Sequence, residues 1–172
     1  DGHIIPSMAV ALEKGFLAIA REAEQGAARF PAGDRRRMAL QAMSIAAAAA
    51  AAAGVRYAAA VRSLPGWETD PYLVRLHDAC GRVPALPART FFEAVQMVWL
   101  VQCMLHWENP AAAVSPGRLD RYLRPYLARD LVAGRVTVGE AQEIVDALWL
   151  KFCEGDESQN VTLGGTDREG RS

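Results

Sequence analysis

The amino-acid sequence predicts a mainly α-helical segment. Its 172 residues are 51% hydrophobic, which is enough apolar material for a packed core and argues against disorder. Alanine, the strongest helix former, makes up roughly a fifth of the chain. Apolar residues also recur every three or four positions in most segments, which is the period of an amphipathic helix. We therefore expect residues 1–153 to be helical, with a loop and one short strand in 154–172.

The first part of the chain predicts three helices. An apolar stripe predicts one continuous helix over residues 6–30. Asp34 is the expected N-cap of a second helix, which passes through an alanine tract to about residue 62. Because alanine lets neighbouring backbones approach closely, we expect this second helix to be buried. A short helix over 72–79 and a proline-punctuated connector over 80–87 follow. The apolar anchors expected for the second helix are Met38, Leu40, Met43 and Ile45.

The second part predicts three more helices and the strand. Thr90 and Glu93 form an expected capping box for a helix that runs to about residue 106 and is apolar on almost every face. A stripe over 119–131 predicts a helix kinked or divided at Pro125. A second expected capping box, at Thr137 and Glu140, opens an amphipathic helix that includes Phe152. Residues 159–165 have β-branched residues and closing glycines, which are typical of a short strand.

Composition excludes several classes of protein. A net charge of −1 lacks the basic excess of a nucleic-acid binder. The nearly apolar run 91–105 is too short and too interrupted to span a bilayer. Three cysteines without a C-x-x-C pair argue against a disulfide framework and a zinc site, and no secretion signal opens the chain. We therefore expect a cytoplasmic protein that binds neither nucleic acid nor a membrane.

Motifs of independent catalytic sites are incomplete. His106-x-Glu108 resembles part of a zinc deaminase signature, but the downstream Pro-Cys-x-x-Cys is missing, so a histidine at a helix end is the better interpretation. Ser115 has no G-x-S-x-G elbow, which argues against a hydrolase. Gly164-Gly165 lacks the spacing of a phosphate-binding loop. The loop 108–117 stands out because its small residues leave room for a ligand or another chain segment, although a packed turn explains it equally well.

The order of several motifs resembles the glycyl radical enzyme family, which includes pyruvate formate-lyase, B12-independent diol dehydratases and arylacetate decarboxylases. The resemblance covers nearly the whole chain and is densest between residues 90 and 170. The matching pieces are 80–84 (CGRVP), 90–99 (TFxEAxQxxW), Glu108, 115–120 (SxGRxD), 130–141 (DLxxGxxTxxEA) and 159–165 (QNxTLGG).

The resemblance implies that this chain is part of a ten-stranded α/β barrel enzyme, contributing helices and a first barrel strand. In that family, a separate S-adenosylmethionine-dependent activating enzyme installs a glycyl radical near the C-terminus, and the radical acts through a cysteine on a central loop. Neither loop is recognisable here, and Cys80, Cys103 and Cys153 lie in other contexts. We therefore expect no catalytic residue and no cofactor in this chain, and no activity from it alone.

One departure from the family concerns the substrate loop, for which we expect Ala112, Ala113, Ser115 and Arg118 to be pocket residues. In dehydratase-like members, a histidine and a serine that approach substrate hydroxyls stand at the positions of Ala112 and Ala113. A hydroxyl left unpaired there costs about 1–3 kcal/mol. The departure favours a small or apolar-flanked substrate, such as a 2-oxo acid or an arylacetate, although the 159–165 motif is closer to dehydratases and decarboxylases.

The main functional prediction is a segment of an enzyme that cleaves a C–C or C–X bond of a small organic substrate by radical chemistry, of formate acetyltransferase, decarboxylase or dehydratase type. Its expected partners are the remainder of the enzyme, the activating enzyme and a second copy of the full protein. The alternative is a non-catalytic helical interaction module, or one piece of a split enzyme.

Overall fold

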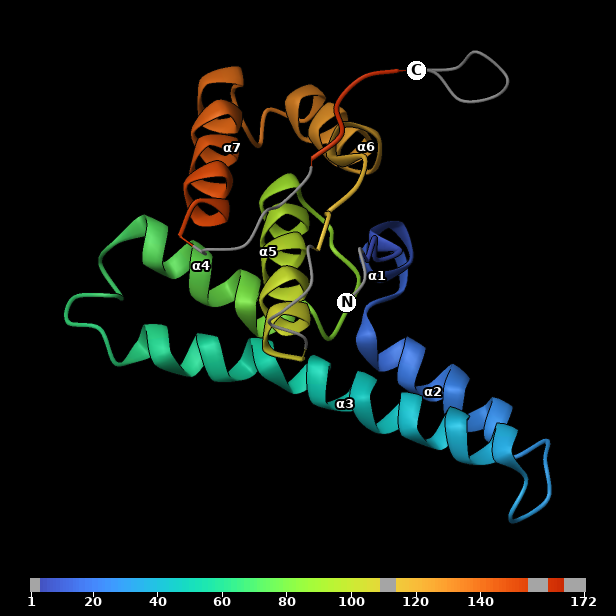
Figure 1. The fold of residues 1–172 in the computed structure, drawn as a ribbon. Helices are drawn as coiled ribbons and strands as arrows, with labels where there is room; N and C mark the ends of the chain where they lie inside the picture. The colour runs from blue at the N-terminus through green and yellow to red at the C-terminus, as the bar shows by residue number, and fades with distance from the viewer. Residues whose placement is uncertain (1–3, 109–113, 155–160, 166–172) are drawn as a thin grey trace. The chain divides into compact units, whose positions relative to one another are not determined.

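The computed structural model describes residues 4–108, 114–154 and 161–165, and this part of the chain contains seven helices (Figure 1). The chain divides into two compact units, one made of residues 10–88 and the other of residues 1–9 and 89–172. The predicted mainly helical character is confirmed.

Two helices, α1 (Met8–Lys14) and α2 (Phe16–Ala27), replace the single helix predicted over residues 6–30. Gly15 breaks the helix because its φ of 70° lies in the left-handed region, which favours glycine. The backbone N–H groups of Phe16 and Leu17 donate to the carbonyls of Pro84 and Ala85 at 2.9 and 3.0 Å. A Cβ on Gly15 would lie 2.5 Å from the carbonyl carbon of Leu86. This close contact with a distant segment has no signature in local periodicity.

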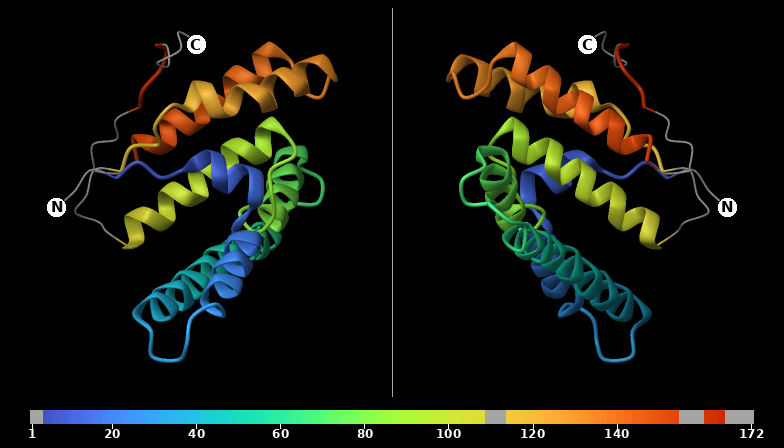
Figure 2. Two further views of the ribbon diagram at one scale, coloured as in Figure 1. Left: turned by 90° about the vertical axis from the view of Figure 1, so that its right-hand side faces the viewer. Right: turned by 90° about the vertical axis from the view of Figure 1, so that its left-hand side faces the viewer.

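Helix α3 (Arg35–Arg62) begins at Asp34, whose side chain accepts a hydrogen bond from the backbone N–H of Arg36, as predicted. It packs against α2, and the two lie side by side in Figure 2. The predicted burial is wrong for most of the helix: only one face is buried. Leu40 lies against Gly26 of α2 and is half-buried. Three of the four expected anchors are exposed: Met38, Met43 and Ile45.

The buried face of α3 consists mostly of alanine and glycine. The predicted close packing of backbones does occur at this face. Gly54 does not interrupt the helix. A Cβ on Gly54 would lie 2.2 Å from the carbonyl oxygen of Val83 and 2.6 Å from that of Cys80. Cys80 belongs to α4 (Pro71–Arg82). This helix begins after Asp70, whose side chain caps it, and it extends into the connector predicted over residues 80–87.

By length and composition alone, one helix among the described residues, α3, could cross a membrane. This helix contains the alanine tract and differs from the run 91–105, which is the most nearly apolar run by sequence. Only 22% of the most apolar window is buried. A single such helix is weak evidence for a membrane span, since core helices of other proteins meet the same criteria.

In the other unit, α5 (Phe91–Glu108) is the central element and contacts both other helices of the unit that follow it. The Thr90 hydroxyl accepts a hydrogen bond from the Glu93 N–H at 3.2 Å, which confirms one half of the expected capping box. The Glu93 carboxylate accepts from the backbone N–H of Arg89, one residue earlier than the motif predicts. The N–H of Phe91 donates to the carboxylate of Asp130.

Two further helices, α6 (Leu119–Val132) and α7 (Val138–Phe152), pack against α5 (Figure 1). Helix α6 runs through Pro125 as one element, so the predicted division there does not occur. The capping box of Thr137 and Glu140 at the start of α7 is confirmed. The ring of Phe152 lies 6.3 Å from that of Trp99 on α5.

The described residues contain no β-strand. The strand predicted over 159–165 is therefore wrong for residues 161–165, the part of it that the structure describes. Two isolated parallel bridges are present instead, between Ile4 and Val114 and between Gly117 and Val161. Residues 159 and 160 lie outside the described residues. A single bridge does not make a strand, because a strand needs a continuous partner for its alternating backbone groups.

Candidate functional site

The candidate site is the segment 114–118, which directly precedes α6. Val114 is fully buried, and the N–H of Ser115 donates to the carbonyl of Ile4 at 2.9 Å. From α5, Nε2 of Gln102 donates to the carbonyl of Val114 at 2.8 Å. The hydroxyl of Tyr122 donates to the carbonyl of Pro116 at 2.8 Å. Backbone carbonyls of this segment are therefore held by side chains from two helices.

An ion pair between Arg118 and Asp120 lies at the C-terminal end of the segment. Nε and Nη2 of Arg118 donate to the two carboxylate oxygens of Asp120 at 2.8 and 2.9 Å. Oδ2 of Asp120 also accepts from the N–H of Gly164 at 2.9 Å, and Nη2 of Arg118 donates to the carbonyl of Gly165 at 3.3 Å. We call these four residues the Arg118–Asp120 clamp. It ties the start of α6 to residues 161–165, alongside the bridge between Gly117 and Val161.

The electrostatics of the clamp follow from this geometry. The hydrogen-bonded guanidinium of Arg118 lowers the pKa of Asp120 to about 2, so the carboxylate is ionised at neutral pH. Burial, together with the nearby charge of Asp120, raises the pKa of Tyr122 above its ordinary range. Tyr122 therefore stays protonated and keeps its hydrogen bond to Pro116. The clamp is a fixed ion pair and an anchor for the backbone.

Two of the four predicted pocket residues lie in the described part of the chain. Ser115 is buried and lies on the anchored segment, and the guanidinium of Arg118 is engaged by Asp120 and Gly165. Ala112 and Ala113 lie outside the described residues. Sequence reasoning missed Gln102, which anchors Val114. A glutamine within a largely apolar helix was the signal that could have found it.

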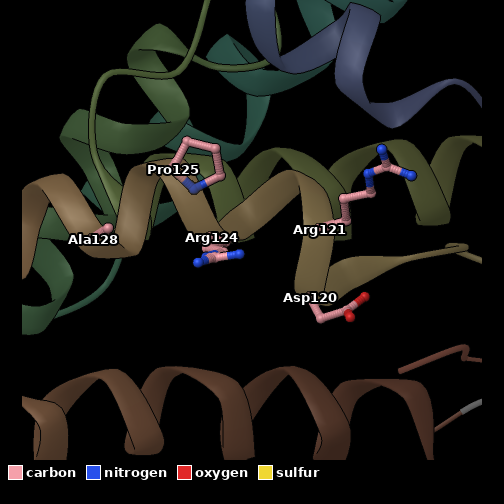
Figure 3. Close-up of a pocket in the computed structure, with 5 residues that line it drawn as sticks. All are labelled: Asp120, Arg121, Arg124, Pro125 and Ala128. Carbon is pink, nitrogen blue, oxygen red and sulfur yellow. The ribbon is translucent and has the colours of Figure 1, made fainter. Parts of the chain in front are cut away.

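A separate hollow of about 550 Å³ lies along α6 (Figure 3). Asp120 is the one residue it shares with the clamp. Neither Ser115 nor Arg118 is among its described lining residues. Among the described residues, its lining comes from α6: Asp120, Arg121, Arg124, Pro125 and Ala128.

Other candidate chemistry finds no support in the described residues. They contain no cluster of three or more side chains able to hold a metal ion. The imidazole of His106 donates to the carbonyl of Gln102 at 2.8 Å, which agrees with the interpretation of a helix-end histidine. Burial raises the pKa of the Cys80 and Cys103 thiols to about 11, which makes both poor nucleophiles.

Comparison with known proteins decides the family. Residues 1–172 match the family model described as pyruvate formate lyase-like. The chain belongs to this family, the glycyl radical enzymes. The resemblance found in the sequence is thereby confirmed. The family's barrel is not contained in this helical segment of a glycyl radical enzyme.

Relatives of this glycyl radical enzyme segment include several lyases and dehydratases. It is 33% identical over 169 residues to isethionate sulfite-lyase of Desulfovibrio desulfuricans, an alignment that covers 92% of this chain and 20% of the relative. It is 38% identical over 118 residues to trans-4-hydroxy-L-proline dehydratase of Clostridioides difficile, covering 66% of this chain and 15% of the relative. The chain thus spans about a fifth or less of the length of these curated relatives.

Solved structures agree with this assignment. A glycyl radical enzyme from Archaeoglobus fulgidus superposes with a TM-score of 0.88 at 31% identity, over 99% of this chain and 25% of that one. A Roseburia inulinivorans structure described for 1,2-propanediol dehydration gives a TM-score of 0.89 at 27% identity, over 99% of this chain and 23% of that one.

Proposed function

We propose that this chain is a segment of an enzyme that cleaves a C–C or C–X bond of a small organic substrate by radical chemistry. The observation that carries the proposal is the family match over residues 1–172. The curated relatives named above are a sulfite-lyase and a dehydratase, both of which break a bond between carbon and a heteroatom group. Within the proposal, the reaction is of decarboxylase, dehydratase or formate acetyltransferase type.

The segment 114–118 and the preceding loop form the proposed substrate side of this chain, with Ala112, Ala113, Ser115 and Arg118 as pocket-loop residues. Arg118 is already bonded to Asp120 and Gly165, so its role in the proposal is to shape the loop. The methyl groups of Ala112 and Ala113 offer no hydrogen bonds, and a substrate hydroxyl buried against them would lose its partner.

A substrate with an apolar flank fits these two alanines best. We propose a 2-oxo acid or an arylacetate. A further relative supports the second class: the chain is 32% identical over 109 residues to indoleacetate decarboxylase of Tractidigestivibacter scatoligenes, an alignment covering 55% of this chain and 12% of the relative.

The catalytic cysteine and the glycyl radical belong, in this proposal, to the remainder of the enzyme, so these 172 residues have no activity alone. The remaining proposed partners are an S-adenosylmethionine-dependent activating enzyme and a second copy of the full protein. The proposed location is the cytoplasm. The role of the present residues is to bind and orient substrate beside the radical site.

The test uses the full-length protein that contains these residues, activated anaerobically by its activating enzyme. Product formation is measured with indoleacetate, pyruvate plus coenzyme A, isethionate, trans-4-hydroxy-L-proline and 1,2-propanediol. The proposal predicts turnover of indoleacetate or pyruvate. Preferred turnover of a hydroxylated substrate would overturn the substrate class. If protein that carries a glycyl radical turned over none of the five substrates, the result would contradict the proposed substrate class.

A variant provides the matched control. Replacing Ala112→His and Ala113→Ser together restores two hydrogen-bonding groups at these positions. The double variant should lose turnover of the preferred apolar-flanked substrate while keeping its glycyl radical, since neither position lies on the radical loops. Unchanged turnover would place the substrate away from this loop.

A further inference from the structure

Helix α3 carries an apolar stripe on its exposed side. Along this stripe, residues recur at alternating intervals of four and three positions, which places them on one face of a helix. Its two large side chains, Met38 and Ile45, are 60% and 72% exposed. We call this set of exposed residues the outer stripe: Met38, Ala42, Ile45, Ala49 and Ala52. Contiguous apolar side chains on a surface, unlike single ones, indicate a site of interaction.

The opposite side of the same helix shows what such a stripe does. Its buried residues follow the same alternation of four and three positions: Ala47, Ala51, Gly54, Ala58 and Val61. At about 100° per residue, this buried stripe lies opposite the outer one. It belongs to the helix that packs against α2 and α4, and Gly54 meets backbone carbonyls there (Figure 1). The outer stripe has the spacing by which one helix packs closely on another.

The charges of α3 indicate which helix fits. This helix contains five arginines and no acidic residue. Arg35 lies three residues before Met38, and Arg56 lies four residues after Ala52, so an exposed arginine bounds the outer stripe at each end. A second copy of α3 laid along the stripe in either direction would bring arginines together, and like charges repel. A helix with acidic side chains near its ends would be attracted instead.

The rest of the enzyme is long enough to supply such a helix. This chain covers 23% and 25% of the two solved structures compared above, so most of each of those proteins lies outside the matching region. We infer that the outer stripe binds a helix from the remainder of the same polypeptide, with apolar side chains along its seam and aspartate or glutamate near its ends to pair with Arg35 and Arg56. The inference rests on the proposal that this chain is a segment of a larger enzyme.

The first experiment compares Met38→Cys with Met43→Cys in the full-length protein. Both methionines lie on α3 and both are 60% exposed, but Met43 lies outside the outer stripe. Alkylation by iodoacetamide is followed by mass spectrometry of the substituted peptides. In native protein, Met38→Cys should react at least about 10-fold more slowly than Met43→Cys, and the two should react equally in urea. Equal rates in native protein would overturn the inference.

A cross-link identifies the chain that covers the stripe. Ile45 is replaced by the photoreactive amino acid p-benzoylphenylalanine in the full-length protein. We expect a product of monomer mass, in which peptide mapping joins position 45 to a helix outside the present 172 residues. A product of dimer mass joined to α3 of a second copy would overturn the inference. So would the absence of any cross-link beyond these residues.

An anionic membrane surface is the competing occupant, because α3 is the described helix whose length and composition allow it to cross a membrane. Alkylation of Met38→Cys is therefore repeated with vesicles of phosphatidylcholine and phosphatidylserine. The inference predicts the same slow reaction with and without vesicles. Protection that appears only when vesicles are present would contradict a protein partner.

The acidic end of the partner is tested at Arg56, with Ala52→Cys as the reporter at that end of the stripe. Arg56→Glu should raise the alkylation rate of Ala52→Cys, because it places a negative charge beside an acidic side chain. Arg56→Lys keeps the positive charge and should leave the rate unchanged. Equal rates in the Glu and Lys variants would overturn the acidic character of the partner.

These measurements need no turnover, so they separate the inference from the proposed function. If the outer stripe is protected in a full-length protein that forms no glycyl radical and turns over no substrate, the proposed function fails and the inference stands. If the protein is active and the stripe is unprotected, the inference alone is overturned.

Discussion

The carboxylate of Asp130, near the end of α6, accepts a hydrogen bond at 2.7 Å from the backbone N–H of Phe91, the first residue of α5. These residues are 39 positions apart, and Asp130 is only 1% exposed. Its other carboxylate oxygen accepts from Nε and Nη2 of Arg135 at 2.9 and 2.8 Å. One buried carboxylate thus caps the central helix and joins it to α6.

Replacement of Asp130 by alanine should destabilise the protein strongly. The change leaves the Phe91 N–H without this acceptor and removes the partner of Arg135, so we expect a loss of about 2–3 kcal/mol in the free energy of unfolding. Urea denaturation measures it. The control is Asp146→Ala on α7, an exposed carboxylate bonded to Gln142, which should change stability by about 0.5 kcal/mol or less. Equal effects of the two substitutions would contradict the capping role.

Gly54→Ala should destabilise the unit formed by residues 10–88, although alanine is the better helix former. Alanine gains about 1 kcal/mol in helix propensity. Its Cβ would meet the carbonyl oxygens of Val83 and Cys80 at 2.2 and 2.6 Å, and backbone atoms cannot move away cheaply. Overpacking of this kind costs about 1–3 kcal/mol or more. We therefore expect a net loss, measured as a lower midpoint in urea.

The matched control for Gly54 is Gly81→Ala in α4. A Cβ at Gly81 meets nothing within 4 Å, so only the propensity gain applies there. The variant should be as stable as wild type or more so, by up to about 1 kcal/mol. A stabilising effect at both positions would show that α3 and α4 are not in close contact at Gly54.

Local signals in the sequence predicted most of the helices. The capping residues Asp34 and Thr137 begin their helices as expected, because a cap depends only on neighbouring residues. The break at Gly15 was not predictable, since it depends on the contact with Leu86 some seventy residues later. Burial of α3 was overpredicted because composition does not say which face a neighbouring element covers: Ile45 is 72% exposed.

The candidate site was predictable only in part. The motif 115–120 contains Arg118 and Asp120, whose short spacing allows them to pair. The bond from Asp120 to Gly164 and the anchor at Gln102 connect residues from different elements. Such contacts are set by tertiary packing, which no local pattern encodes.

The Arg118–Asp120 clamp should weaken in acid. Because Arg118 lowers the pKa of Asp120 to about 2 in the folded protein, the ionised carboxylate stabilises the fold above the unfolded pKa of about 3.9. That contribution is lost as the pH falls from about 4 to about 2, as the folded carboxylate becomes protonated. Urea midpoints measured between pH 5 and 2 should therefore fall more steeply for wild type than for Asp120→Asn. Parallel curves would contradict a lowered pKa at Asp120.

The three cysteines should react with iodoacetamide in a defined order. At pH 8, thiols with a pKa of about 11 have about one thiolate per thousand molecules, which applies to Cys80 and Cys103. Cys153 is exposed and should be alkylated first. Mass spectrometry of peptides from native protein measures the order, with urea-unfolded protein as the control in which all three react. Faster alkylation of Cys80 than of Cys153 would contradict the described packing.

The central claim is that this helical segment serves a radical lyase, and the most direct measurement is EPR of the full-length protein. The protein is incubated anaerobically with its activating enzyme, S-adenosylmethionine and a reductant. Our account predicts the doublet of a glycyl radical, which disappears on exposure to air. No doublet, under conditions in which the same activating preparation produces one in a known glycyl radical enzyme that it recognises, would contradict it.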